Sequence, residues 1–156
     1  MRTTVVPRVT PETAGFWAHC RDGVLSVQQC SDCGHRRFPP QPMCSQCHSR
    51  SSSWAPVDPN ATLYTYTVVP GPGAAWEVPL PGEHGYPFAI AIVELGTANP
   101  VRMVTDIGTE WLDRIRIGMP MTVVFERVND EINLPRFVPD PEESTGAAAR
   151  AENQEG

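Results

Sequence analysis

Two copies of one cysteine motif lie close together in this chain of 156 residues. The motifs are Cys30-Ser-Asp-Cys33 and Cys44-Ser-Gln-Cys47. Such a pair places four soft sulfur donors around a single ion, and a zinc ion held by four thiolates is the usual site of this kind. We therefore predict one structural zinc ion bound by Cys30, Cys33, Cys44 and Cys47. Because four protein ligands leave no coordination position for water, we expect the metal to support folding and not catalysis.

Residues 34–43 separate the two motifs, and this short spacer is typical of a zinc ribbon. It leaves no room for a recognition helix of the zinc-finger type. A rubredoxin-like iron centre uses the same four ligands and stays open as an alternative. Two disulfides would need an oxidising compartment, which the odd number of 5 cysteines and the lack of a recognisable signal peptide argue against. The fifth cysteine, Cys20, is expected to be a buried small apolar residue and not a nucleophile.

The composition argues against several classes of function. The formal net charge is -6, which opposes the basic surface that non-specific nucleic-acid binding requires. All 12 basic residues are arginine, so the chain offers no lysine for a Schiff base, a general base or a phosphate-binding loop. No apolar run is long enough to span a bilayer, and no targeting peptide is visible. We expect a soluble cytoplasmic protein.

Residues 1–23 are predicted to form an N-terminal arm and one helix. Thr10 is a candidate N-cap, with a proline after it at the first helical position, and Gly23 would end the helix. Phe16 and Trp17 belong to one apolar stripe at helical spacing. The stripe either packs on the chain's own core or faces a partner protein, since an exposed Phe-Trp pair makes a good interface anchor.

The zinc ribbon is expected over residues 24–57, with a strand leading into the first motif and an antiparallel return at 36–38. Residues 58–139 contain five strand patterns, with one helical turn at 109–113 between the third and fourth. The strands are predicted at 63–69, 88–95, 101–106, 121–127 and 132–138. The predicted fold class is therefore mainly β: an N-terminal helix and a zinc ribbon followed by a five-stranded OB-fold barrel. Residues 140–156 are predicted to be a disordered acidic tail.

A long segment, residues 70–86, separates the first two barrel strands. Loops of this length in a compact domain are usually functional or disordered, and Trp76 and Tyr86 would be wasteful in a purely solvated loop. His84 follows Glu83, and this is the one neighbouring His–carboxylate pair with acid–base potential. A polar surface turn is the preferred interpretation, because no third group completes a catalytic set.

Short segments spread along the chain together match one known family. They are Phe16-Trp17, Cys30-x-x-Cys33-Gly34, Phe38-Pro39-Pro40, Cys44-x-x-Cys47, Trp54, Tyr64-Thr65-Tyr66-Thr67-Val68-Val69, Tyr86-Pro87-Phe88, Ile117-Gly118-Met119-Pro120 and Phe125-Glu126. In this order, and over residues 11–139, the chain resembles the acyl-CoA-associated zinc-ribbon (rubredoxin-like) and OB-fold proteins, a family long catalogued as a domain of unknown function. The cysteine motifs alone are moderately specific, and their combination with the barrel segments is much more so.

The resemblance implies an accessory subunit and not an enzyme in its own right. Such proteins pair with thiolase-like enzymes (thiolases, ketoacyl synthases and lipid-transfer-protein-type aldolases of steroid side-chain degradation) or with MaoC-like enoyl-CoA hydratases, and the partner carries the chemistry. The implied function is a non-catalytic, zinc-binding subunit of an acyl-CoA-processing complex in steroid or fatty-acid degradation, which meets acyl-CoA through the complex. The candidate contacts with the partner or with CoA are Phe16, Trp17, Trp76, His84 and Tyr86. Three arginines are candidates for contacts with CoA phosphates: Arg36, Arg37 and Arg102.

Two rival functions follow from the residues themselves. Zinc ribbons and OB barrels also occur in modules that bind single-stranded nucleic acid, where Tyr64 and Tyr66, predicted on one strand face, would stack bases. The net negative charge argues against this alternative. An independent enzyme would have to use His84 or Cys20. No third group completes a catalytic set with Glu83 and His84, and no Cys–His pairing can be argued for Cys20.

Overall fold

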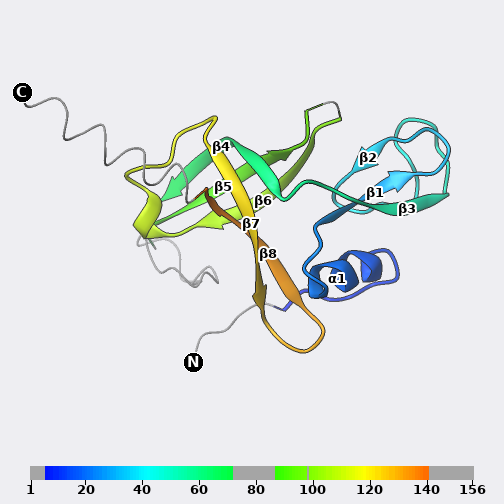
Figure 1. Cartoon of the computed structure of the whole chain (residues 1–156), viewed down its shortest axis with the longest axis horizontal. Coiled ribbons are helices and arrows are strands. Elements are labelled where there is room, and N and C mark those ends of the chain that lie inside the picture. Colours follow the sequence, from blue (N-terminus) through cyan, green and yellow to red (C-terminus); the bar gives the residue numbers. More distant parts are fainter. Residues whose placement is uncertain (1–5, 72–86, 98, 141–156) are drawn as a thin grey trace, which may run out of the picture.

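A short helix precedes two β-sheets in the computed structural model, which describes residues 6–71, 87–97 and 99–140 (Figure 1). The helix α1 spans Ala14–Arg21 and begins later than predicted. The carbonyl oxygen of Thr10 accepts hydrogen bonds from the N–H groups of Thr13 (3.0 Å) and Ala14 (2.8 Å), so a turn precedes the helix and Thr13 is its N-cap. Gly23 follows the helix as predicted, with a φ of 74° that favours glycine. No helix in the described part of the chain is long and apolar enough to cross a membrane.

The ribbon contains a three-stranded antiparallel sheet in the order β2-β1-β3. Its strands are β1 (Ser26–Cys30), β2 (Arg36–Arg37) and β3 (Ser52–Pro56). Strand β2 confirms the predicted antiparallel return, in which Gln28 pairs with Arg37. No sequence pattern indicates β3, because its serines have low β-propensity. This segment becomes a strand because its backbone pairs with the free edge of β1.

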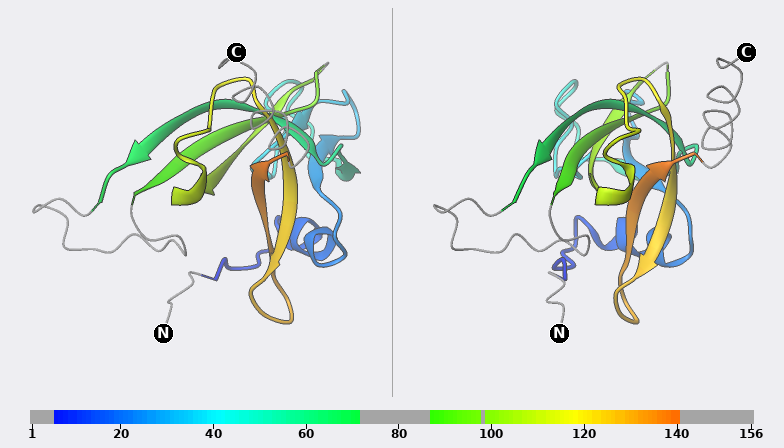
Figure 2. Two further views of the ribbon diagram at one scale, coloured as in Figure 1. Left: turned by 60° about the vertical axis from the view of Figure 1, so that its left-hand side comes forward. Right: turned by 90° about the vertical axis from the view of Figure 1, so that its left-hand side faces the viewer.

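A five-stranded antiparallel sheet follows, in the order β6-β5-β4-β7-β8. Its elements are β4 (Asn60–Val69), β5 (Phe88–Leu95), β6 (Val101–Ile107), the 3-10 turn η1 (Thr109–Trp111), β7 (Pro120–Arg127) and β8 (Asn133–Pro139). All five predicted strands and the helical turn between the third and fourth are confirmed. Figure 2 shows that the sheet curls, so that the hairpin of β7 and β8 crosses the layer formed by β4, β5 and β6. This arrangement is that of a small OB-type barrel.

A β-bulge in β4 separates two tyrosines that the strand pattern places together. The register against β5 shifts between Leu63 and Thr65, so Tyr64 has no partner in the ladder. Tyr64 is 44% exposed, whereas Tyr66 packs against the core and its hydroxyl donates to the carbonyl oxygen of Ile115 (3.5 Å). The prediction that Tyr64 and Tyr66 share one face is therefore wrong, and the two rings do not form a platform for stacking bases.

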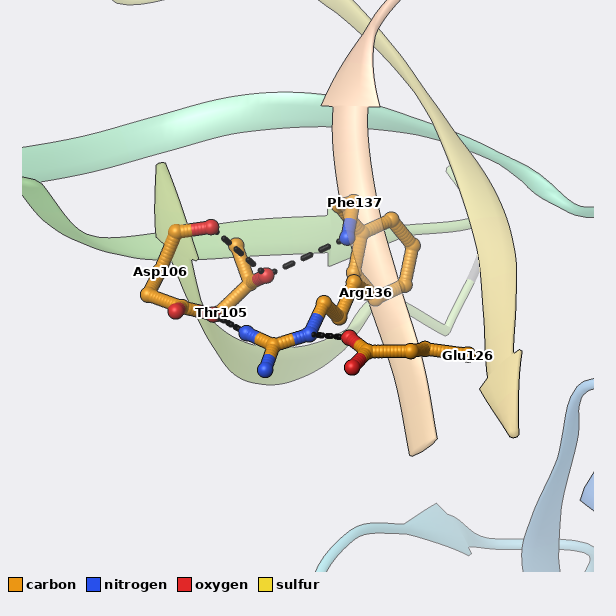
Figure 3. A network of polar contacts seen from close by, with 5 residues as sticks. All are labelled: Thr105, Asp106, Glu126, Arg136 and Phe137. Atoms are coloured by element: carbon orange, nitrogen blue, oxygen red, sulfur yellow. Dashed lines mark hydrogen bonds and ion pairs between the residues drawn. The ribbon is translucent and has the colours of Figure 1, made fainter. Parts of the chain in front are cut away.

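The two ends of the five-stranded sheet meet along a seam between β6 and β8. Among the described residues no backbone ladder joins these two strands, and side chains bridge them instead (Figure 3). The buried hydroxyl of Thr105 accepts a hydrogen bond from the backbone N–H of Phe137 (3.1 Å). The guanidinium of Arg136 donates to Asp106 across the seam and to Glu126 on β7. These contacts hold the barrel shut without a continuous ladder.

One continuous core joins the helix, the ribbon and the barrel. Phe16, Cys20 and Leu25 belong to the same buried cluster as the inward side chains of the barrel strands. The side-chain amide of Asn133, at the start of β8, donates to the carbonyl oxygen of Arg21 (3.2 Å) at the end of α1. The helix is therefore fixed to the barrel, and the ribbon that follows it is held beside the barrel.

Candidate metal centre

Two equivalent turns present the four cysteines. The N–H of Gly34 donates to the carbonyl oxygen of Cys30 (3.0 Å), and the N–H of His48 donates to that of Cys44 (2.9 Å). Gly34 and His48 both adopt the left-handed conformation, with φ values of 73° and 60°. Because the same backbone turn occurs twice, the repeated sequence motif is also a repeated structure. Each turn directs its two cysteine side chains toward those of the other.

The four sulfur atoms form one cluster. Their positions all lie within 4.8 Å of one another. Two distances between the motifs are 3.5 Å, from Cys30 to Cys47, and 3.6 Å, from Cys33 to Cys44. Zn–S bonds of about 2.3 Å in a tetrahedron place the sulfurs about 3.8 Å apart, so the cluster fits zinc. None of the cysteines is in a disulfide. The predicted four-thiolate ligand set is confirmed, and the alternative of two disulfides is wrong.

Backbone N–H groups prepare two of the thiols for metal binding. The N–H of Cys33, together with that of its neighbour, lowers the pKa of Cys30 to about 6. The N–H of Cys47 lowers the pKa of Cys44. The N–H of Ser49 also lowers the pKa of Cys47, but contacts with the sulfurs of Cys33 and Cys30 outweigh it and raise that pKa to about 12. A divalent cation among the sulfurs favours all four thiolates at once, which removes this conflict.

Cys20, the cysteine outside the cluster, is fully buried on α1 as predicted. Burial raises the pKa of its thiol to about 12. A buried thiol of such high pKa stays protonated, and the thiolate is the reactive form of cysteine. The independent-enzyme alternative therefore loses Cys20 as a nucleophile.

Of the five predicted contacts with a partner or with CoA, two lie among the described residues. Phe16 is 3% exposed, and its ring centroid lies 4.9 Å from that of Trp17, 5.1 Å from Phe38 and 6.2 Å from Trp54. Phe16 therefore packs in the chain's own core, as in the first of the two alternatives for the apolar stripe of the helix, and does not face a partner. Trp17 is partly buried at the edge of this cluster, and its contact with a partner stays a prediction. The other three contacts lie outside the described residues: Trp76, His84 and Tyr86.

The structure brings together three arginines that are distant in the sequence. Arg36 and Arg37 of β2 and Arg102 of β6 line one open cleft between the ribbon and the barrel, with a volume of ≈ 370 Å³. The sequence identifies each arginine as a candidate for phosphate contacts, but it contains no sign that they share a site. Local patterns cannot reveal this, because the cleft depends on how the ribbon packs beside the barrel.

Two domain families match this chain. Residues 17–52 match the family described as "ChsH2, rubredoxin-like zinc ribbon domain". Residues 54–126 match the family described as "ChsH2, C-terminal OB-fold domain". The two matches follow each other without overlap and cover the metal centre and most of the barrel. They confirm the predicted zinc ribbon and OB fold, and the ribbon family together with the four close cysteines fits a structural zinc site.

Two curated proteins resemble the chain in sequence. The "Probable enoyl-CoA hydratase alpha subunit" of Thermomonospora curvata is 30% identical over 136 residues, which is 85% of this chain but only 39% of that protein. The "DUF35 domain-containing scaffold protein" of Pyrococcus furiosus is 25% identical over 119 residues, which is 76% of this chain and 82% of that protein. The chain thus spans about two-fifths of the first relative and most of the second.

Two solved structures resemble the chain in three dimensions. A chain of the "Ltp2-ChsH2(DUF35) aldolase" has a TM-score of 0.70 and 28% identity, with 86% of this chain and 98% of that chain covered. A DUF35-family protein of unknown function from Sulfolobus solfataricus has a TM-score of 0.57 and 13% identity, with 85% and 87% covered. The second likeness concerns the fold alone.

Proposed function

The chain belongs to the ChsH2 (DUF35) family of zinc-ribbon and OB-fold proteins, and we propose that it is a non-catalytic, zinc-binding subunit of a thiolase-like enzyme that processes acyl-CoA. The observation that carries the proposal is the likeness to a chain of the Ltp2-ChsH2(DUF35) aldolase, which extends over nearly the whole of that chain. The step from that chain to this one is an analogy between domains of the same fold, so association with a partner has to be tested directly.

The chemistry of the described residues supports a role without catalysis. The metal site has four protein thiolates, so zinc in it has no open position for water or substrate. The remaining cysteine, Cys20, is buried, and burial raises the pKa of its thiol to about 12, which disfavours the reactive thiolate. Lysine is absent from the sequence, which removes several common catalytic mechanisms. Zinc would therefore stabilise the ribbon, whose small sheet buries little apolar surface of its own.

The relatives point to two classes of partner, a thiolase-like enzyme and a MaoC-like hydratase, with different weight. The aldolase whose chain resembles this one favours a thiolase-like partner. The hydratase subunit favours a MaoC-like partner more weakly, because this chain spans only 39% of that protein. We place a thiolase-like protein first, in the degradation of steroids or fatty acids, and a MaoC-like hydratase second.

We assign the contact with the partner to an apolar patch on the outer face of the barrel. Ile90 of β5 and Val104 of β6 are 38% and 68% exposed. Ile92 lies opposite Val104 in the ladder and, two residues from Ile90, faces the same side of β5. The alternate residues of β5, Ala89, Ala91 and Val93, point into the core. Apolar side chains gathered on one exposed sheet face favour an interface.

Affinity capture tests both the partner and the patch. The zinc-loaded chain, tagged and expressed in the cells to which it is native, is compared with Val104→Asp and with a matched control, Ile117→Asp, where Ile117 is 66% exposed and Val104 is 68% exposed. We expect stoichiometric recovery of a thiolase-like protein by the wild type and the control, and its loss with Val104→Asp. Recovery of no stoichiometric protein would overturn the subunit proposal, and recovery of a hydratase-like protein would reverse the order of the partners. Equal recovery with both variants would overturn only the assignment of the patch.

A further inference from the structure

The cleft between the ribbon and the barrel concentrates positive charge in an acidic protein. The residues that line it include no aspartate or glutamate: His35, Arg36, Arg37, Phe38, Pro100, Val101 and Arg102. The formal net charge of the whole chain is -6. Three guanidinium groups in one cleft therefore stand out against the rest of the molecule and attract anions.

Arg37 is the most unusual of the three arginines because it is buried without a counter-ion. Its residue is 7% exposed, and Nη2 donates to the carbonyl oxygen of Gln41 (3.3 Å). Its Nε and Nη1 atoms are buried and have no hydrogen-bond partner among the described residues. A buried cation with unpaired donors is costly unless an anion compensates it. Arg37 thus places a fixed positive charge in the wall of the cleft.

The other two arginines each engage the protein through Nε alone. Nε of Arg36 donates to the side chain of Gln29 (3.2 Å). Nε of Arg102 donates to Glu94 (3.0 Å), and its guanidinium lies 3.6 Å above the ring of Tyr64. The three arginines carry three positive charges, and Glu94 contributes one negative charge, so the cleft has a formal net charge of +2. Among the described residues, the Nη groups of Arg36 and Arg102 make no hydrogen bond with the protein and can meet a ligand. Gln29 and Tyr64 fix the directions of the two side chains.

We propose that this cleft binds the phosphate groups of a small phosphate ester, with a diphosphate preferred to a single phosphate. Guanidinium groups form paired hydrogen bonds with phosphate oxygens, and two arginines from different sheets suit a ligand with two adjacent phosphates. The volume of ≈ 370 Å³ is within the range of small-molecule sites. The inference stands apart from the proposed partnership, because the whole site lies within this chain.

Titration of the zinc-loaded full chain tests the proposal. Backbone amide signals are followed by NMR while inorganic phosphate, inorganic pyrophosphate or CoA is added. The double variant Arg36→Gln/Arg102→Gln is compared with Arg114→Gln/Arg127→Gln, which removes the same charge from exposed arginines elsewhere. Arg37 is left intact because its replacement would disturb the ribbon. We expect saturable shifts around 35–38 and 100–102 with pyrophosphate, weaker binding of phosphate, and at least a tenfold loss of pyrophosphate affinity in the cleft variant alone.

Each outcome decides one question. Pyrophosphate binding that the control variant keeps and the cleft variant loses supports the site. Tighter binding of CoA than of pyrophosphate then identifies a nucleotide ester as the source of the phosphates, and equal binding identifies free diphosphate. Absence of saturable shifts in the cleft, or an equal loss in the control variant, would overturn the proposal. None of these outcomes depends on partner capture, so this proposal and the proposed function fail separately.

Discussion

The seam between β6 and β8 gives the most direct test of how the barrel is held shut. Arg136 bridges it by donating to Asp106 on β6 and to Glu126 on β7. The side chains of the three residues are 18%, 24% and 30% exposed, so the network is largely shielded from water. Replacement of Arg136 by methionine keeps most of the apolar stem but removes the guanidinium that both carboxylates contact.

We expect Arg136→Met to lower the free energy of unfolding by about 3 kcal/mol. Removal of one partner from a buried ion pair typically costs about 3–5 kcal/mol, since an uncompensated charge remains. The lower end applies here because the two carboxylates keep about a quarter of their exposure. For a chain of this size, the free energy of unfolding falls by about 2 kcal/mol for each molar increase in urea. The urea concentration at the midpoint of unfolding should therefore fall by about 1.5 M.

Urea unfolding followed by circular dichroism measures this change. The control is Arg127→Met, whose ion pair with Asp130 is 72% and 92% exposed, and it should cost no more than about 0.5 kcal/mol. Adding Glu126→Gln to Arg136→Met should recover about 1 kcal/mol, because one stranded charge is removed. A urea midpoint for Arg136→Met equal to that of Arg127→Met would refute the claim that the contacts of Arg136 hold β6 and β8 together.

Four further predictions concern the helix and the cysteines. Gly15→Ala, which helix propensity favours by about 1 kcal/mol, should instead destabilise, because its Cβ would lie 2.0 Å from Nε1 of Trp54; a urea midpoint above that of the wild type would contradict the packing. Cys44→Ser should reduce bound zinc, measured by mass spectrometry of the metal, from one equivalent to none, and full retention would contradict the ligand set. Cys20 should resist alkylation at pH 8 until the chain unfolds, because burial raises its pKa to about 12. Since its thiol ionises first in the unfolded chain, it should also lower stability as the pH rises from about 8.5 toward 12, and an equal alkaline loss in Cys20→Ala would exclude it as the cause.

The metal ligands and the barrel strands could be predicted because their physical causes are local. Four cysteines at fixed spacing determine a ligand set whatever surrounds them, and Gly34 supplies the left-handed turn that the first motif needs. The barrel strands carry runs of β-branched and apolar residues that only a buried sheet explains. Cys20 belongs with these, since a free cysteine on an apolar helix stripe is usually buried.

What the sequence did not reveal depends on pairing between distant segments. The serines of β3 form a strand only because β1 offers a free edge. The bulge at Tyr64 turns its ring away from that of Tyr66, and strict alternation cannot anticipate an inserted residue. The three arginines of the cleft meet because the ribbon packs beside β6, and nothing near Arg37 in sequence indicates that its guanidinium is buried.

Reconstitution of activity tests most directly whether this chain is a non-catalytic subunit of an acyl-CoA enzyme. The captured thiolase-like partner is purified without the chain, and acyl-CoA turnover is measured for the partner, for the zinc-loaded chain and for their equimolar mixture. We predict no turnover by the chain alone and a higher rate for the mixture than for the partner. Turnover by the chain alone, or a mixture no more active than the partner, would contradict the proposed role.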